Sequence, residues 1–211
     1  MPGGQERVAG TARNAVQKKR SGEYHHGDLK TALKLAALRL VRERGRPEFS
    51  LNEASRLAGV SVGAPYRHFA DKDALLAEIA CDGSDLMIKR LQRAATEGAT
   101  VPERIVAVGM EYLRFAKENA EYFAVIFKSG LDKANYPEVE RKGREAFGVI
   151  LGLAKDIERT PELATGRAVS CWALVHGLAV LSADGALGTA VAVGDDAEYA
   201  RTLLERFLTQ P

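Results

Sequence analysis

Residues 50 to 76 constrain the fold more than any other part of this 211-residue chain. Ser50 is followed three residues later by Glu53, a capping box in which each side chain can satisfy the other's free backbone N–H at a helix start. Gly59 ends that short helix, and a third helix is predicted over residues 61 to 69. Helices this short are not stable alone, so the stretch has to fold against a partner.

A supporting helix precedes this stretch and a longer one follows it. Apolar residues recur at helical spacing from about Asp28 to Arg44, and Asp71 can cap a fourth helix. Two short helices joined by a glycine-containing turn, with a helix in front, are the plan of a helix-turn-helix. The shared core is predicted to contain Leu33, Ala37, Leu57, Val60 and Phe69.

The third helix is predicted to begin with small side chains, and polar side chains follow them. Val62, Gly63 and Ala64 let the backbone approach base pairs in a major groove. The next residues supply groups that bind phosphate oxygens, and Arg67 can also offer a bidentate fork to guanine. These polar residues are Tyr66, Arg67, His68 and Lys72. Taken singly, they could equally be core aromatics and a solvated charged face.

The charge distribution favours DNA binding over that simpler interpretation. The chain carries +2 overall, but residues 1 to 72 carry +7 and the remainder carries −5. Residues 1 to 23 lack a hydrophobic period and contain Lys18, Lys19 and Arg20, so they are predicted to be a flexible basic arm. This arm could contact DNA or be a solubilising tail.

The body after Thr100 is predicted to be helical throughout, giving about nine helices and no sheet in an all-α fold. The expected helices begin at Pro102, Glu121, Pro137, Pro161 and Asp195. A glycine-rich stretch, residues 185 to 194, separates the last two. The uncharged run from Ala168 to Ala183 is 16 residues, short of the roughly 20 that span a bilayer, so a buried helix and no membrane contact are expected.

Several chemistries have no support in the sequence. Cys81 and Cys171 are too few for a disulfide framework and lack the partners of a zinc site, so a cytoplasmic protein without a bound metal is expected. The N-terminus has no export signal, and no phosphate loop or cofactor motif occurs. We therefore expect no cofactor.

The body is rich in aromatic residues, which suits either a core or a ligand cavity. Trp172 and His176 are four residues apart and share a helix face, where His176 could be a polar handle or a core histidine bonded to a backbone carbonyl. The candidate ligand-binding residues are Met110, Tyr112, Phe115, Phe123, Phe127, Phe147, Trp172 and His176.

Dimerisation is expected because one helix-turn-helix covers few base pairs. The long helix from residue 162 to 183 and the last helix could pair with their copies, although packing within one chain would use the same side chains. The candidate interface residues are Leu174, Leu178, Leu181, Leu203, Leu204 and Phe207.

The segment from Ser50 to Leu76, SLNEASRLAGVSVGAPYRHFADKDALL, resembles the N-terminal domain of the tetracycline-repressor (TetR) family of bacterial transcriptional regulators. The sequence YHHGDL at residues 24 to 29, and Trp172 with His176-Gly177, resemble the branch named for a Trp-His-Gly C-terminal domain. Ser55 and Pro65 depart from the usual pattern without breaking it.

The resemblance implies a homodimeric repressor that binds a near-palindromic operator and is released by a small, apolar ligand. It implies a DNA-binding domain over residues 24–72 and a helical ligand-binding and dimerisation domain over residues 73–211. By position, it places Ser50, Asn52, Tyr66, His68 and Lys72 on DNA, with Val62, Gly63, Ala64 and Arg67 at the groove-facing turn.

Two other functions stay open. One is a ligand-independent architectural DNA-binding protein. The other is an all-α enzyme that uses His176 with an acidic partner such as Asp184, although no nucleophile motif accompanies them.

Overall fold

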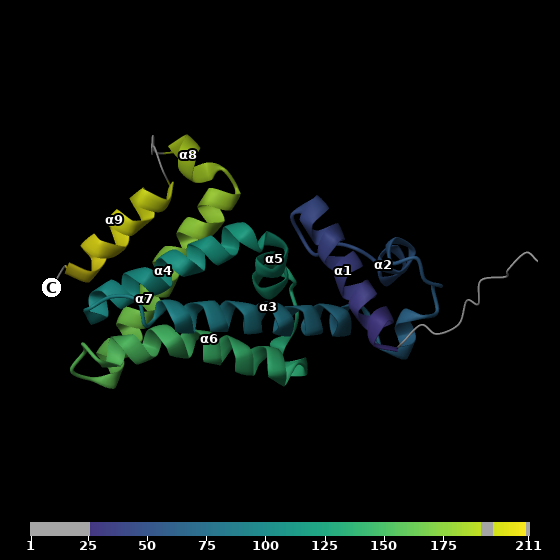
Figure 1. Cartoon of the computed structure of the whole chain (residues 1–211), viewed down its shortest axis with the longest axis horizontal. Helices are drawn as coiled ribbons and strands as arrows, with labels where there is room; N and C mark the ends of the chain where they lie inside the picture. The colour runs from purple at the N-terminus through teal and green to yellow at the C-terminus, as the bar shows by residue number, and fades with distance from the viewer. Residues whose placement is uncertain (1–25, 191–195, 210–211) are drawn as a thin grey trace, which may run out of the picture.

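The computed structural model describes residues 26–190 and 196–209, so the expected arm at residues 1–23 lies outside it. The described residues form nine α-helices and two short 3-10 turns without a strand, which confirms the all-α prediction (Figure 1). The α-helices are α1 (His26–Arg44), α2 (Leu51–Leu57), α3 (Lys72–Ala94), α4 (Val101–Glu118), α5 (Ala120–Lys128), α6 (Pro137–Lys155), α7 (Pro161–Ala183), α8 (Ala186–Ala190) and α9 (Asp196–Thr209), and the 3-10 turns are η1 (Pro65–Arg67) and η2 (Lys133–Asn135).

Side-chain caps fix where the long helices begin. The Asp71 carboxylate accepts the Ala74 backbone N–H at 2.7 Å and starts α3, as the sequence predicts. The helix expected from Pro102 begins one residue earlier, because Thr100 and Glu103 form a second capping box. The Thr-x-x-Glu spacing was the available signal for it.

The helix predicted over residues 61 to 69 is reduced to η1. Counted from Ser61 as the cap, Pro65 is the first residue whose N–H would bond back four residues, and proline has no N–H. The backbone takes the tighter three-residue spacing instead, with the Ala64 N–H donating to the Ser61 carbonyl at 3.0 Å.

The N-terminal core joins the head, residues 26–72, to the body, residues 73–209. Leu33, Ala37 and Phe69 are buried as predicted, whereas Leu57 is 39% exposed and Val60 is half-buried. The same core takes in side chains from three body helices, among them Leu75, Leu76 and Ile79 of α3, Ala124 and Val125 of α5, and Val139 of α6. Helix α3 therefore belongs to both parts of the molecule.

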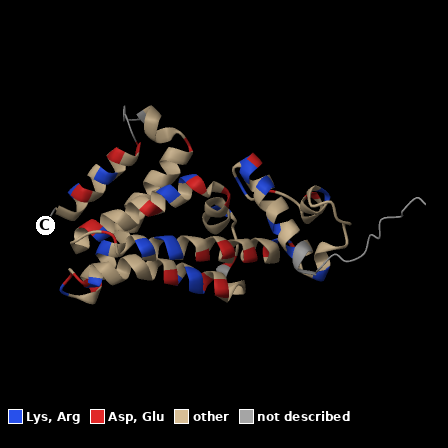
Figure 2. Cartoon of the chain, viewed as in Figure 1, with Lys and Arg blue, Asp and Glu red and all other residues tan. Residues whose placement is uncertain are grey.

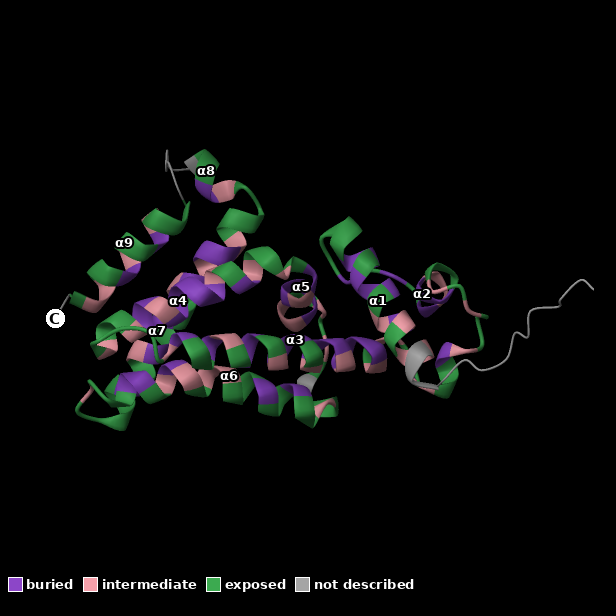
Figure 3. Cartoon of the chain, in the orientation of Figure 1, coloured by how far each residue is buried: buried purple, intermediate pink, exposed green. Residues whose placement is uncertain are grey.

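In the body, α3 and α6 run side by side, and α4 and α7 pack across them (Figure 1). Helix α9 closes on α4 at Gly109, where an added Cβ would lie 2.7 Å from Leu204 Cδ1. Leu204 is 0% exposed and sits in the core of the chain, while the outer faces of α8 and α9 are exposed (Figure 3). Burial is thus concentrated between α3, α4, α6 and α7.

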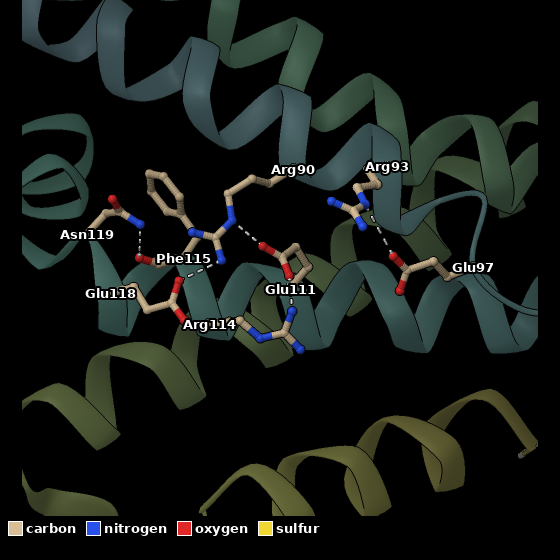
Figure 4. Close-up of polar contacts among 8 residues, drawn as sticks. All are labelled: Arg90, Arg93, Glu97, Glu111, Arg114, Phe115, Glu118 and Asn119. Atoms are coloured by element: carbon tan, nitrogen blue, oxygen red, sulfur yellow. Dashed lines mark hydrogen bonds and ion pairs between the residues drawn. The ribbon is translucent and has the colours of Figure 1, made fainter.

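A polar cluster fixes α3 to α4 (Figure 4). The Arg90 guanidinium donates to the buried Glu111 carboxylate and, at 2.8 Å, to Glu118. Arg114 donates to the other oxygen of Glu111, so two guanidinium groups compensate one buried carboxylate. The Arg90 guanidinium also lies 6.0 Å from the centre of the Phe115 ring.

Helix α7 is only partly the buried helix that the sequence predicts. It extends back to Pro161, and among the described helices it alone is long and apolar enough to cross a membrane by length and composition. One side of it, including Ala168, Cys171 and Val175, is buried in the body core. The other side leaves apolar residues exposed, with Leu163 at 53%.

Candidate nucleic-acid interface and ligand cavity

The segment from residue 61 to 69, which we call the tip, projects exposed side chains from the head (Figure 3). Tyr66 is 57% exposed, and Val62, Gly63 and Arg67 are also exposed. Ala64 and His68 are half-buried. The tip therefore presents most of the predicted groove-facing residues to solvent.

Two buried side chains hold the tip on the head. The Pro65 ring is buried, and the Phe69 side chain is 2% exposed within the N-terminal core. The Phe69 N–H donates to the Pro65 carbonyl at 2.9 Å, which closes the turn between the two anchors. The exposed residues between them are consequently held in one place.

Uncompensated positive charge gathers around the tip. Within the described part of the head, most basic side chains have an acidic partner, for example Lys30 with Glu78 at 2.6 Å and Arg44 with Glu53 at 2.6 Å. Three basic residues form no ion pair with a described residue, namely Arg56, Arg67 and Lys72. Beyond Lys72, the acidic residues of α3 lie in the half nearer the head and the basic residues in the other half, whereas α6 mixes both signs (Figure 2).

Arg56 was missed by the sequence analysis. It lies in the last turn of α2, immediately before the turn that leads into the tip, and it is exposed. Its exposure follows from the helical period of α2, since Ala54 and Ser55 face the core and Arg56 does not. That periodicity was the signal that could have identified it.

Ser50 and Asn52, the two residues predicted to contact DNA from the start of α2, differ in whether their side chains already make hydrogen bonds. Ser50 is occupied by the capping box, because its hydroxyl accepts the Glu53 N–H at 3.2 Å and its own N–H donates to that carboxylate at 2.8 Å. Hydrogen bonds from Arg44, and then from Ser50, lower the pKa of Glu53 to about 2, so the box stays ionised. Asn52 is half-buried, and its amide oxygen has no hydrogen-bond partner among the described residues.

The body contains a cavity of about 370 Å³ between α3, α4, α5, α6, α7 and α9. Of the predicted ligand-binding residues, Tyr112, Phe127, Phe147 and Trp172 line it. Met110, Phe115, Phe123 and His176 are not among the residues that line it. Met110, Phe115 and Phe123 are buried in the body core, and the Arg90 guanidinium lies over the Phe115 ring.

His176 is a structural partner of Tyr112. The Tyr112 hydroxyl lies 2.8 Å from His176 Nδ1, and the imidazole stacks on Phe123 with ring centres 5.6 Å apart. Burial raises the pKa of Tyr112, against a hydrogen bond with Trp172, while burial and then Lys128 lower the pKa of His176. When the imidazole is neutral, the Tyr112 hydroxyl can donate a hydrogen bond to Nδ1. The hydrogen-bond partner of His176 is therefore a side chain, whereas one interpretation of the sequence was a backbone carbonyl.

Asp184, the acidic partner considered for a catalytic His176, pairs with a different residue. Its carboxylate lies 3.9 Å from the Lys128 ammonium, and no bond joins it to His176 in the described residues. The paired acid and base that the enzyme hypothesis requires are thus not brought together.

Most of the cavity wall comes from residues that the sequence analysis did not select. These are Ser84, Met87 and Leu91 of α3, Ile105, Val108 and Gly109 of α4, Ile126 of α5, Val139, Glu140, Gly143, Arg144, Ala146 and Ile150 of α6, Cys171 and Val175 of α7, and Leu204 of α9. Aliphatic residues on amphipathic helices carry no signal that separates a cavity wall from a core. Only the packing of the helices distinguishes them.

The predicted dimer-interface residues separate into two groups. Leu178 and Leu204 are buried inside the single chain, as in the alternative of packing within one chain that the sequence left open. Leu174, Leu203 and Phe207 are half-buried, and Leu181 is exposed. Leu181 continues an exposed apolar face of α7, which we define by Leu163, Val169 and Leu181.

Comparison with known proteins matches both parts of the chain. The family model described as bacterial regulatory proteins of the tetR family matches residues 35–79. The model described as the tetracyclin repressor-like C-terminal domain matches residues 105–207. The two matches do not overlap, and together they cover well over half of the chain.

Individual relatives agree with this. An uncharacterised helix-turn-helix transcriptional regulator of Haemophilus influenzae is 29% identical over 98 residues, which are 45% of this chain and 47% of that protein. The chain thus matches about half the length of this relative. A protein of unknown function from Rhodococcus sp. RHA1 is 27% identical with a TM-score of 0.69, covering 89% of this chain and 98% of the other.

A more distant structure shares the fold. The transcriptional regulator FadR of Bacillus subtilis, in complex with stearoyl-CoA, is 14% identical with a TM-score of 0.67, covering 85% of this chain and 97% of the other. The order of helices, the exposed tip and the two family matches lead to one conclusion. The chain is a transcriptional regulator of the tetR family, with an N-terminal helix-turn-helix and a helical C-terminal domain.

Proposed function

We propose that this protein is a cytoplasmic, homodimeric repressor that binds a near-palindromic operator and is released by a small, mainly apolar ligand. The observation that carries the proposal is the exposed tip with Arg56, Arg67 and Lys72 around it, since no described acidic residue pairs with these charges. Phosphate oxygens are their natural partners. Trp172 with His176-Gly177 supports the Trp-His-Gly branch within the family.

Different residues in and beside the tip would contact phosphates and base edges. Lys72, at the first position of α3, lies beside the head with its ammonium 5.9 Å from the Phe49 ring, and it would hold a phosphate. Arg67 and Tyr66 are exposed on η1, where Arg67 can reach a base edge. Val62, Gly63 and Ala64 would let the backbone approach, with Ser50, Asn52 and His68 at the margins.

A salt titration on an operator selected from genomic fragments tests this. If a dimer neutralises about eight phosphates, log K falls against log salt with a slope near −7. Lys72→Ala should weaken binding to all sequences and reduce the slope by about 1, whereas Arg67→Ala should also cost about 1–3 kcal/mol of base preference.

The control is Lys117→Ala, which removes an exposed lysine from α4 in the body. It should leave both slope and preference as they are. An unchanged slope for Lys72→Ala would refute its role. Broad coverage of the genome, with no sharp palindromic sites, would favour the architectural alternative.

Ligand release would act through α3. This helix begins at Lys72 in the head and contributes Ser84, Met87 and Leu91 to the cavity wall. A ligand that binds the cavity only when α3 is tilted would change the distance between the two heads of a dimer, which must match about 34–36 Å. About 3 kcal/mol of coupling would give hundredfold release.

A further inference from the structure

One serine on the cavity wall has a hydroxyl that no described residue engages. Ser84 lies in the middle of α3, is 3% exposed and lines the cavity. Its hydroxyl makes no hydrogen bond to any other described residue. The Ser84 oxygen is not among the sealed side-chain atoms without a partner in the described residues, as Asn52 Oδ1 is, so it stays accessible from the cavity.

The other buried serine of the described chain shows the usual solution. Ser55 of α2 is 0% exposed, and its hydroxyl donates to the Leu51 carbonyl, four residues back, at 2.7 Å. Thr165 on α7 does the same with the Pro161 carbonyl at 2.8 Å. Ser84 forms no such bond within its helix, which leaves its hydroxyl available to whatever occupies the cavity.

The charges on the cavity wall are already compensated. Glu140 and Arg144 are its charged lining residues, and they pair with each other one turn apart on α6. Close by, Lys142 of the same helix pairs with Asp85, the neighbour of Ser84. A charged ligand group would find no unpaired opposite charge there, and burying it would be expensive.

The remaining polar groups of the wall are engaged or weak. The Tyr112 hydroxyl is bonded to His176, and the Trp172 indole N–H is engaged by a hydrogen bond with Tyr112. Burial raises the pKa of the Cys171 thiol to about 11, which keeps it neutral. A thiol is a poor hydrogen-bond donor. Ser84 is therefore the strongest available hydrogen-bonding group on the described wall.

We propose that Ser84 determines the specificity of the effector site, and that the cavity takes an uncharged, mainly apolar molecule whose oxygen group hydrogen-bonds the Ser84 hydroxyl. This inference deepens the proposed function and rests on its ligand-binding part. It places the one polar contact of the ligand on α3, the helix that also carries Lys72.

The single tryptophan of the chain makes a direct measurement possible. Trp172 lines the cavity, so its fluorescence reports occupancy without DNA. Titrating the full-length protein with 2-decanone, decane, decanoate and decylammonium compares four probes of one chain length. We expect 2-decanone to bind about three- to tenfold more tightly than decane, and more tightly than either ion.

Ser84→Ala should remove the advantage of 2-decanone over decane and leave the affinity for decane unchanged. The matched control is Ser170→Ala, which removes an exposed hydroxyl of α7 that does not line the cavity, and it should keep the advantage. The order of the four probes on the unmodified protein tests the charge argument even if Ser84→Ala fails to fold.

Three results would overturn the inference: the advantage persists in Ser84→Ala, an ion binds more tightly than 2-decanone, or no probe changes Trp172 fluorescence. Operator release is measured separately, by adding 2-decanone to the DNA complex. If the Ser84-dependent preference holds and the complex is unaffected, this inference stands and release by the ligand fails.

Discussion

Tyr112 and His176 join α4 to α7 through one hydrogen bond, and Tyr112 is buried while His176 is half-buried. Phe123 and Phe127 surround the imidazole, with ring centres 5.6 and 4.8 Å away. These neighbours favour the neutral ring, and Lys128 adds a repulsive positive charge. Protonation of His176 therefore opposes folding.

The sign of the resulting pH dependence is determined by the lowered pKa of His176. As the pH falls through about 6.5, the unfolded chain takes up a proton that the folded chain does not, so the free energy of unfolding decreases. We expect it to be level above about pH 7 and to fall on the acid side. Urea unfolding at several pH values measures it.

His176→Gln should remove the part of the acid-side decrease in unfolding free energy that His176 causes. The variant should also be less stable at pH 8, because Tyr112 loses its hydrogen bond to the imidazole. His68→Gln, in the tip, serves as the control and should keep the decrease. Equal pH profiles for the unmodified protein and His176→Gln would show that another group is responsible.

At the scale of helices, α3 and α5 approach so closely that only glycine fits between them. An added Cβ at Gly83 would lie 2.6 Å from Tyr122 Cδ1 and 3.0 Å from Tyr122 Cβ. The ring is held by its own backbone and cannot swing away as the end of a flexible chain would. The glycine therefore sets the separation of the two helices.

Gly83→Ala should destabilise the protein by about 1–3 kcal/mol, since overpacking outweighs the gain in helix propensity. The matched control is Gly148→Ala on α6, where an added Cβ meets nothing within 4 Å. That variant should be stabilised by up to about 1 kcal/mol. Denaturant unfolding of both compares them, and equal shifts would contradict the close approach.

Helix starts could be predicted from the sequence because their signals are local. Ser50 with Glu53 and Asp71 before α3 each act within one turn of chain, and the structure has both caps. The tip could be located for the same reason, but its conformation could not. Pro65 ends the predicted helix early, because its missing N–H falls where the first helical hydrogen bond should form.

The cavity could be predicted only in part, because its wall is a product of packing. Tyr112 and Trp172 could be selected because they are aromatic. Ser84 and the aliphatic residues line the cavity because the packing of the whole helical bundle decides which side of each helix faces it. Met110 and Phe123 have the same residue types and lie outside the wall. Composition indicates that a cavity can form, and tertiary structure decides which side chains line it.

At the scale of the whole molecule, the exposed apolar face of α7 is the surface that we expect to pair with a second copy. Its members Leu163, Val169 and Leu181 are all more than 40% exposed in the single chain. Exposed apolar side chains that share one helix face are typical of interaction surfaces. Helix α9 packs on the outside of the body core, and its residues Leu203 and Phe207 are half-buried there.

Val169→Glu should therefore convert dimers to monomers, weakening association by about thirtyfold or more if Val169 lies near the centre of the interface. Sedimentation velocity over a range of concentrations measures this. Leu35→Glu is the control, because Leu35 is the most exposed large apolar side chain described but lies on α1 in the head. Equal behaviour of the two variants would exclude this face.

The two buried anchors of the tip have a thermodynamic consequence. Pro65 has a fixed φ and a buried ring, and Phe69 is locked into the core four residues later, so the exposed segment loses its conformational freedom when the protein folds. A surface that is already ordered has little entropy left to lose on docking. Encounter with the double helix then approaches rigid-body association, in which the rate is set by orientation and electrostatic attraction, not by a folding step.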